Sequence, residues 1–321
     1  MSFATGNPVL VEVMRSGFTE SVHRGAVVVT APDGTVRAAL GDVDTPVFPR
    51  SSNKPFQALG MLKAGLEIDD TDLALVCASH SGEPGHVNRA LAMLAAAGLS
   101  EDDLHCPPEP RRAAMNCSGK HAGMLTTCVQ RGWSTADYTD PEHPLQRTIA
   151  DTVVELTGEK IAAVGVDGCG APLFAFSLTG LARAFSSASR TRVGEVMRTN
   201  PWLVAGTGRE DTLLMLAVPG LLCKGGAEGV HAMTLPDGTT VALKTDDGAS
   251  RARGPLLVAA LRALDAVPDN PAARSVLDGL GRGSGLVLGG GREVGELRVT
   301  TEFATELARQ LNRSREANSL Q

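Results

Sequence analysis

Two Pro-Asp-Gly tripeptides, at positions 32–34 and 236–238, constrain the fold of this chain more than any other feature. Each is flanked on both sides by a short apolar run rich in β-branched residues, which is typical of a β-hairpin. Two further runs of this kind, near the two ends of the chain, predict additional strands. The predicted strands are Val9–Met14, Gly25–Thr30, Val36–Leu40, Gly229–Leu235, Thr240–Lys244 and Glu293–Thr300.

Helical patterns fill much of the remaining sequence. Phe56, Leu59, Leu62 and Leu66 recur at the spacing of one helix face. Hairpins combined with helices predict an α/β protein of the α+β kind, with an antiparallel sheet and flanking helices. The predicted helices are residues 56–66, Val87–Ala97, Leu145–Leu156 and Ser250–Leu264, and the short apolar segment Asp72–Ser79 is predicted to be a strand.

No linker rich in Gly, Ser or Pro divides the chain. We therefore expect residues 1–321 to form a single domain with two lobes, one of them helical. Residues 314–321 are polar and are expected to form a flexible tail. The region after Leu264 carries no motif that can be assigned a role.

The composition argues against several classes of partner. Aromatic residues make up only 3% of the chain and the formal net charge is −6, whereas nucleic acids and anionic membranes attract concentrated Lys and Arg. No apolar run approaches the roughly 20 residues that span a bilayer. Met1–Asn7 also lacks the pattern of a secretory signal. We expect a cytoplasmic protein that binds neither nucleic acid nor membrane, with its six cysteines reduced.

Ser51 and Lys54 stand three positions apart where a strand region gives way to a helix, so both side chains share one face of its first turn. Pro55 supports this placement, because proline is tolerated at a helix start. A serine hydroxyl becomes a good nucleophile when a base removes its proton, and a lysine in a dry pocket can be that base. The spacing also occurs by chance, with Ser51 then capping the helix and Lys54 on the surface.

Two clusters combine cysteine with other reactive side chains, Asn116–His121 and Asp167–Gly170. Cys117 and Cys169 offer two thiolates to a Zn²⁺ ion, with Lys120 or His121 close by in the sequence. A lysine ligand has to be neutral, which requires desolvation or the charge of the metal itself. Read alone, the two cysteines also fit buried thiols in glycine-rich turns.

Two further segments carry polar side chains where a predicted strand ends. Lys244 is the last residue of a predicted strand and the first residue of the polar segment Lys244–Gly248. At such a junction the lysine side chain points either into a cleft or into solvent. Ser79 and Ser81 flank His80 at the end of the apolar segment Asp72–Ser79, a common place for site residues.

Seven segments of this chain, in the same order, resemble those of one family, the Rhizobium-type (class 3) L-asparaginases of the asparaginase II family. One such segment would mean little, but seven in order are specific. They run through most of the chain, and they are Arg50–Lys54, Cys77–Glu83, Asn116–Met124, Asp167–Gly170, Gly206–Arg209, Gly225–Gly229 and Lys244–Gly248.

The resemblance implies a fold related to serine β-lactamases and glutaminases, which also place a Ser-x-x-Lys motif at the start of a helix. It implies that Ser51 pairs with Lys54 as nucleophile and base. It also implies a second catalytic pair that joins Ser79 to Lys244. The match to the family around Cys77–Glu83 is loose, so either Ser79 or Ser81 remains a candidate for the second serine.

The same resemblance implies a zinc ion beside the catalytic pocket, held by Cys117, Lys120 and Cys169. In such enzymes the zinc supports substrate binding or order more than it supplies the attacking water. The family also implies a homodimer. The residues expected to border the pocket and bind the substrate are Arg50, His121 and Asp167.

These inferences lead to the hypothesis of an L-asparagine amidohydrolase that produces L-aspartate and ammonia through a Ser–Lys nucleophilic mechanism. A glutaminase is an alternative, because one extra methylene is worth only about 1–3 kcal/mol of discrimination. A β-lactamase-like hydrolase is another. A zinc-stabilised binding protein without turnover is a third, but it leaves the Ser–Lys pair unexplained.

Overall fold

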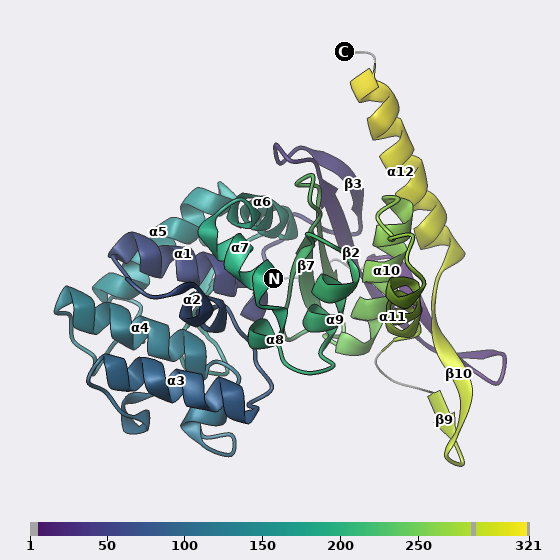
Figure 1. Ribbon diagram of the computed structural model, residues 1–321. Helices are drawn as coiled ribbons and strands as arrows, with labels where there is room; N and C mark the ends of the chain where they lie inside the picture. Colours follow the sequence, from purple (N-terminus) through teal and green to yellow (C-terminus); the bar gives the residue numbers. More distant parts are fainter. Residues whose placement is uncertain (1–5, 284–286, 320–321) are drawn as a thin grey trace. The chain divides into compact units, whose positions relative to one another are not determined.

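Most of the described strands form one antiparallel sheet. The computed structural model describes residues 6–283 and 287–319. Within them, eight strands join in the order β6-β7-β8-β2-β1-β10-β9, with β3 paired to β2 (Figure 1). The strands are β1 (Val9–Arg15), β2 (Phe18–Thr30), β3 (Val36–Leu40), β6 (Leu222–Gly225), β7 (Val230–Thr234), β8 (Thr240–Thr245), β9 (Val287–Gly289) and β10 (Arg292–Val299).

Strand β2 carries the centre of this sheet. Its first half pairs with β1, and its second half pairs with both β3 and β8. The run Gly25–Thr30 is buried at every position, which explains why its sequence is continuously apolar instead of alternating. Gly25 is needed there, because a Cβ at this position would lie 2.2 Å from the main-chain oxygen of Lys244 on β8.

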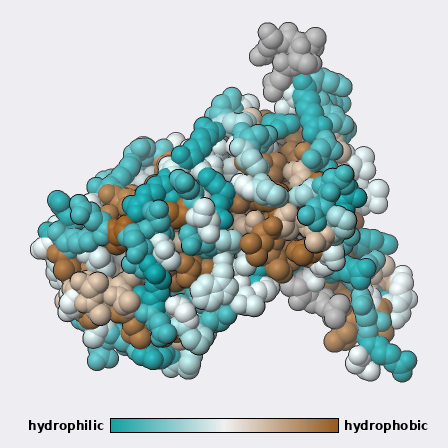
Figure 2. Space-filling model, in the orientation of Figure 1, coloured by the Kyte–Doolittle hydropathy of each residue, from teal (hydrophilic) through white to brown (hydrophobic). Residues whose placement is uncertain are grey.

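Two helices near the end of the chain, α10 (Arg253–Ala263) and α12 (Thr301–Ser319), contact strands of this sheet, and α11 (Pro271–Gly281) packs on α10 (Figure 1). Phe303, Leu307 and Leu311 recur every four residues and are buried, so they anchor one face of α12. Its visible outer side is hydrophilic (Figure 2). Helix α12 continues to Ser319, so residues 314–319, which we predicted as a tail, are helical; residues 320–321 lie outside the described residues.

Contacts divide the chain into two compact units. The sheet unit consists of the described residues within 1–45, 177–186 and 213–321. The helical unit consists of residues 46–176 and 187–212. Each unit is built from separate stretches of sequence, so no single linker separates them, and α6 (Leu178–Ser189) and α9 (Glu210–Ala217) each contribute residues to both.

The helical unit packs its helices closely around α4, whose residues Ser118–Cys128 are all buried. Small residues permit this packing: a Cβ added at Gly119 or Gly123 would overlap α2, and one at Gly60 would overlap α5. A short hairpin completes the unit. Its elements are α1 (Lys54–Ala64), α2 (Asp70–Val76), α3 (Pro84–Ala96), α4 (Ser118–Arg131), α5 (Pro144–Thr157), α7 (Arg192–Thr199), α8 (Pro201–Val204), β4 (Ala163–Val166) and β5 (Pro172–Ala175).

The predicted α+β class, with an antiparallel sheet, flanking helices and a largely helical part, is confirmed. One element was predicted wrongly: most of Asp72–Ser79 is the helix α2, not a strand. The Asp69 side chain accepts a hydrogen bond from the main-chain N–H of Asp72 and so caps this helix. Among the described helices, none combines the length and apolar character needed to cross a membrane.

Candidate functional site

The segment Arg50–Lys54 makes the transition into helix α1. Arg50–Asn53 is one turn of 3₁₀ helix, and the main-chain N–H of Lys54 donates to the carbonyl of Ser51. Pro55 lies in the first turn of α1, as its place in the sequence predicted. Ser51 is half-buried, whereas Lys54 is only 1% exposed. Lys54 is therefore a buried group and not a surface lysine.

The Lys54 ammonium lies among three acceptors. Its Nζ is 3.0 Å from Ser79 Oγ and 3.5 Å from the carbonyl oxygen of Asn116, and it also donates to the carbonyl of Ala78. In the neutral form, the same geometry lets the Ser79 hydroxyl donate to Nζ while the two N–H groups bind the carbonyls. The hydroxyl that Lys54 contacts directly is thus that of Ser79, which our pairing of Lys54 with Ser51 did not include.

The structure separates the roles of Ser79 and Ser81. Ser79 follows helix α2, is 9% exposed and bonds Lys54. Ser81 is exposed, and its hydroxyl donates to Glu83 Oε1 at 2.6 Å. Of the two serines that the sequence left open, Ser79 is the one beside the buried lysine.

Lys244 lies near the end of strand β8 in the sheet unit, opposite Ala26 of β2. Its Nζ donates to the main-chain oxygens of Glu228 and Thr245, both at 2.8 Å. Burial lowers the pKa of this lysine. Ser79 belongs to the helical unit, so the pairing of Ser79 with Lys244 stays a prediction.

A buried histidine, missed in the sequence, holds the loop that follows Lys244. His23 Nδ1 is 2.6 Å from Asp247 Oδ2, and Arg251 Nε donates to His23 Nε2 at 2.9 Å. Because Arg251 can only donate, the neutral ring with its proton on Nδ1 fits this arrangement. On the other side of the loop, Asn7 donates to Asp246 at 2.7 Å. His23 stands in no recognisable motif, so only the fold could reveal it.

Helix α4 and the turn Asp167–Gly170 bring the predicted metal ligands together. Cys117 occupies the position directly before α4, and Lys120 stands in the first turn of this helix, where its Nζ lies 3.0 Å from Cys169 Sγ. A hydrogen bond from Cys117, together with the nearby Lys120 ammonium, lowers the pKa of Cys169 well below its usual range although burial opposes this. The same hydrogen bond raises the pKa of Cys117. The two thiols and the Lys120 amine thus lie together in one buried cluster.

His121 offers a further nitrogen at this cluster. Its Nδ1 lies 2.7 Å from the Tyr138 hydroxyl. Its Nε2 is buried and makes no hydrogen bond of ordinary length to any described residue, while the ring lies close enough to Cys169 to lower the pKa of that thiol. Sulfur and nitrogen donors in this number suit Zn²⁺. The residue types present therefore suit Zn²⁺ if Cys117 and Lys120 give up their protons, and the zinc site stays a prediction.

Arg50 and Asp167, both predicted to bind substrate, form an ion pair with each other. Arg50 Nε donates to Asp167 Oδ1 at 2.8 Å, and the main-chain N–H of Gly168 donates to the same oxygen at 2.9 Å. Arg50 also has φ of +51°, a strained conformation for a residue other than glycine. The pair links the segment that carries Ser51 to the turn that carries Cys169.

A second network, also missed in the sequence, surrounds the segment after Ser79. His80 Nε2 lies 2.9 Å from Ser118 Oγ, and the N–H of Gly82 donates to His80 Nδ1 at 3.1 Å. The His80 ring stacks on His86 at 4.9 Å, and His86 stacks on Trp202 at 4.1 Å. Both nitrogens of His80 are used, so this ring positions its neighbours and is not free to act as a base.

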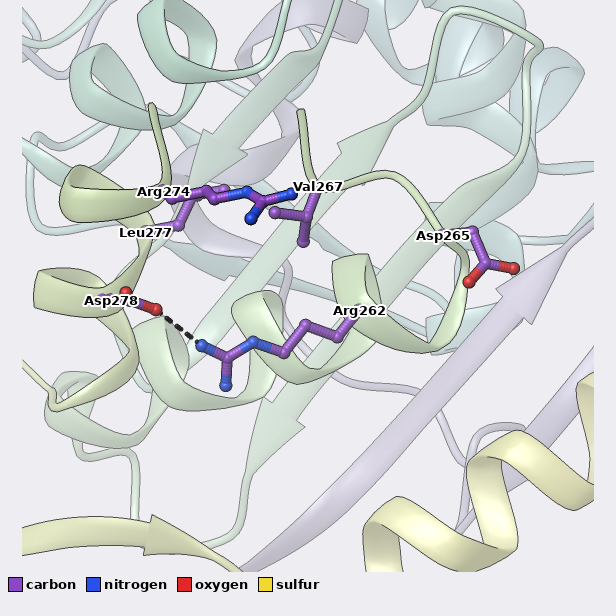
Figure 3. A pocket seen from close by; sticks show the side chains of 6 residues that line it. All are labelled: Arg262, Asp265, Val267, Arg274, Leu277 and Asp278. Atoms are coloured by element: carbon purple, nitrogen blue, oxygen red, sulfur yellow. Dashed lines mark hydrogen bonds and ion pairs between the residues drawn. The ribbon is translucent and has the colours of Figure 1, made fainter. Parts of the chain in front are cut away.

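One hollow in the sheet unit lies away from all the predicted site residues. It has a volume of about 430 Å³ and lies between α10, α11 and the loop that joins them (Figure 3). Its charges are largely paired, with Arg262 bonded to Asp278 at 2.8 Å. It offers no nucleophile and no soft metal ligand, so we do not assign the chemistry to it. Its lining residues are Arg262, Asp265, Val267, Arg274, Leu277 and Asp278.

Comparison with known proteins identifies one family. The model of the L-asparaginase II family matches residues 11–299. No curated protein matches the chain in sequence.

Two solved structures show distant similarity. A β-lactamase from Mycobacterium bovis shares 15% sequence identity over 70% of this chain and 88% of that chain, with a TM-score of 0.35. Mglu in its tris and glutamate form shares 16% identity over 78% of this chain, with a TM-score of 0.33. The match spans 61% of the length of Mglu.

Proposed function

The chain belongs to the L-asparaginase II family, and from this premise we propose that it hydrolyses the side-chain amide of L-asparagine to L-aspartate and ammonia. The observation that carries the proposal is the buried Lys54, hydrogen-bonded to Ser79 at 3.0 Å and three residues after Ser51. A buried lysine in contact with a serine hydroxyl, and close in sequence to another serine, is an arrangement that can activate serine for acyl transfer.

In the proposed mechanism Ser51 is the nucleophile. It is half-buried, so a substrate can reach it, whereas Ser79 is 9% exposed and already bonds Lys54. Neutral Lys54 removes the Ser51 proton as Oγ bonds to the amide carbon. Ser79, in contact with Lys54, is placed to pass protons.

The tetrahedral intermediate then collapses. Its oxyanion is stabilised by main-chain N–H groups near the start of α1, each worth about 3 kcal/mol. The C–N bond breaks as Lys54 returns its proton to the leaving ammonia. Water attacks the resulting acyl-enzyme and gives a proton to Lys54. Lys54 then passes this proton to Ser51 Oγ as the acyl C–O bond breaks, which releases L-aspartate and restores Ser51 and neutral Lys54. In this scheme Lys244 assists the second step through Ser79.

The substrate is a zwitterion, and the charges at its α-carbon also have to be bound. Asp167 is 11% exposed at its side chain and lies beside Arg50, so its carboxylate is suited to the substrate α-ammonium group. His121 is fully buried, and we propose that it acts on the metal side of the site.

We further propose that Cys117, Lys120 and Cys169 hold a zinc ion, with His121 Nε2 directed to the same cluster. When bound, the zinc supplies positive charge that fixes these segments. The residues on either side, Asn116 and Asp167, then keep their positions at Lys54 and Arg50. We also propose that the protein is a cytoplasmic homodimer. Light scattering on the purified protein measures its mass and so tests whether it is a dimer.

Ammonia release from L-asparagine and L-glutamine, measured side by side, tests the function. We expect turnover of L-asparagine that is lost in Ser51→Ala and retained in Ser187→Ala, an exposed serine on α6. Preferred turnover of L-glutamine would instead make the protein a glutaminase. Hydrolysis of a chromogenic β-lactam, with no ammonia from either amide, would make it a β-lactamase-like hydrolase. No turnover at all would contradict an enzymatic function.

A further inference from the structure

The α-carboxylate of an amino-acid substrate requires a cation, and arginine is the side chain that binds carboxylates in two-point contact. Arg50 is the nearest candidate by sequence, since it precedes Ser51 directly. However, its Nε is already bonded to Asp167 at 2.8 Å. A second candidate is an arginine on the same unit whose whole guanidinium is unengaged among the described residues.

Arg209 is such an arginine. It is exposed, and no hydrogen bond or ion pair within the described part of the chain engages its guanidinium. Its main-chain N–H donates to the carbonyl of Gly206 at 3.4 Å, which closes the turn Gly206–Arg209. Both ends of this turn belong to the helical unit, like Ser51, Lys54 and Ser79.

The turn is fastened to the segment that carries Ser79. The main-chain N–H of Ser79 donates to the carbonyl of Val204 at 2.9 Å. The Glu83 carboxylate accepts hydrogen bonds from the main-chain N–H and from the hydroxyl of Thr207, both at 2.8 Å. Trp202 Nε1 donates to the same hydroxyl at 3.1 Å. These bonds tie the turn that ends at Arg209 to the segment that follows Ser79.

Gly206 brings the two segments into contact. Its φ is +116°, and a Cβ at this position would lie 2.0 Å from Ser81 Oγ and 2.8 Å from Glu83 Oε1. Only glycine permits this approach. Because the Glu83 carboxylate is used by Ser81 and Thr207 and makes no ion pair with Arg209 among the described residues, the Arg209 charge stays available.

We propose that Arg209 is the specificity-determining residue that binds the α-carboxylate of the amino-acid substrate. The inference rests on the proposed amidase function, and it deepens that function by requiring a substrate with a free α-carboxylate. The locked turn supplies the rigidity that a point of recognition needs.

The test compares L-asparagine with β-alaninamide, which is the same amide without the α-carboxylate. In Arg209→Met we expect the KM for L-asparagine to rise about 10- to 100-fold, because a charge-assisted hydrogen-bond pair is lost. We expect kcat to stay nearly constant, since the contact is made before and during the reaction alike. The KM for β-alaninamide should not change.

Two further variants complete the experiment. Arg209→Lys keeps the charge without the fork and should recover part of the lost affinity. Arg147→Met, an exposed arginine on α5 whose side chain is 64% accessible, is the matched control and should behave as the wild type. An unchanged KM for L-asparagine in Arg209→Met, or an equal rise for both amides, would overturn the proposal while leaving the amidase function intact.

Calorimetry separates this proposal from the function on which it rests. The wild type should bind L-aspartate more tightly than β-alanine, and Arg209→Met should lose that preference. If the wild type released no ammonia, the amidase proposal would fail, and these binding measurements would still decide on Arg209. Equal binding of the two acids, or no binding of either, would overturn its role.

Discussion

Lys54 Nζ lies 3.0 Å from Ser79 Oγ, although 25 positions separate the two residues in the sequence. Lys54 therefore contacts a hydroxyl from a second segment of the chain, in addition to standing in the motif that contains Ser51. Nucleophile and proton carrier can then be different serines around one base. This arrangement leads to separate predictions for Ser79 and for Lys54.

Ser79→Ala should lower kcat for L-asparagine by about 100-fold or more, the usual contribution of a positioned proton carrier. Ser51 is intact in this variant, so the acyl-enzyme should still form, only more slowly. Rapid acid quench followed by intact-mass measurement detects it. Ser81→Ala, which affects a hydroxyl bonded to Glu83, should have a much smaller effect on kcat. If no acyl-enzyme forms in Ser79→Ala, the conclusion would be that Ser79, and not Ser51, is the nucleophile.

Lys54→Met should abolish ammonia release and also destabilise the protein. The carbonyls of Ala78 and Asn116 would lose their donor, and a buried group left unpaired costs about 1–3 kcal/mol. Urea denaturation measures this loss. Lys54→Arg keeps a positive charge but cannot release it as a base does, so it should be inactive as well. Activity near wild type in Lys54→Arg would contradict the role of Lys54 as base.

Removal of the cysteine cluster should remove zinc. We expect one zinc per chain by elemental analysis, and none in Cys117→Ser or Cys169→Ser. Cys128→Ala, a change on the same helix α4, should keep the metal. Added zinc should raise the melting temperature of the wild type, since a ligand at 100 times its Kd stabilises by about 2.7 kcal/mol. Equal zinc content in all four proteins would contradict the assigned ligands.

His80 should make stability depend on pH. Burial, together with the neighbouring His86 and Lys54, lowers its pKa from 6.5 to about 3. The unfolded chain then binds more protons than the folded one between these values. The wild type should lose stability as pH falls from 6.5 towards 3, and His80→Gln should show a shallower loss. Melting temperatures across this range measure the difference; parallel curves would show that His80 is not the group responsible.

The Glu83 carboxylate should affect stability at a lower pH than His80 does. Hydrogen bonds from the Ser81 hydroxyl, and then from the N–H and hydroxyl of Thr207, lower its pKa from 4.5 to about 2. Its contribution is present above pH 4.5 and is lost as pH falls through 2. Glu83→Gln should therefore be less stable than the wild type at pH 7, with the gap closing below pH 4.5. Because Glu83→Gln anchors the turn that carries Arg209 less firmly, this variant should also have a higher KM for L-asparagine than the wild type. An unchanged KM would argue against the turn as a recognition element.

Local patterns predicted the hairpins around both Pro-Asp-Gly turns and the helices that contain Phe56, Leu145 and Leu256. They failed at Asp72–Ser79, because eight residues are too few to distinguish a buried helix from a strand by periodicity. The capping residue Asp69 was a usable signal there. They also left helices α11 and α12 unassigned, although Phe303, Leu307 and Leu311 show the spacing of a helix face.

The sequence by itself predicted which residues could carry the chemistry, and it determined which of them are neighbours on one turn: Ser51 with Lys54, and Cys117 with Lys120. Only the tertiary structure decided that Lys54 contacts Ser79, that Lys120 contacts Cys169, and that Arg50 is paired with Asp167, 117 positions away. The physical reason is that helical periodicity acts over three or four residues. Contacts between distant segments depend instead on how whole helices pack, and here they depend on glycines such as Gly119 and Gly206 that let backbones approach.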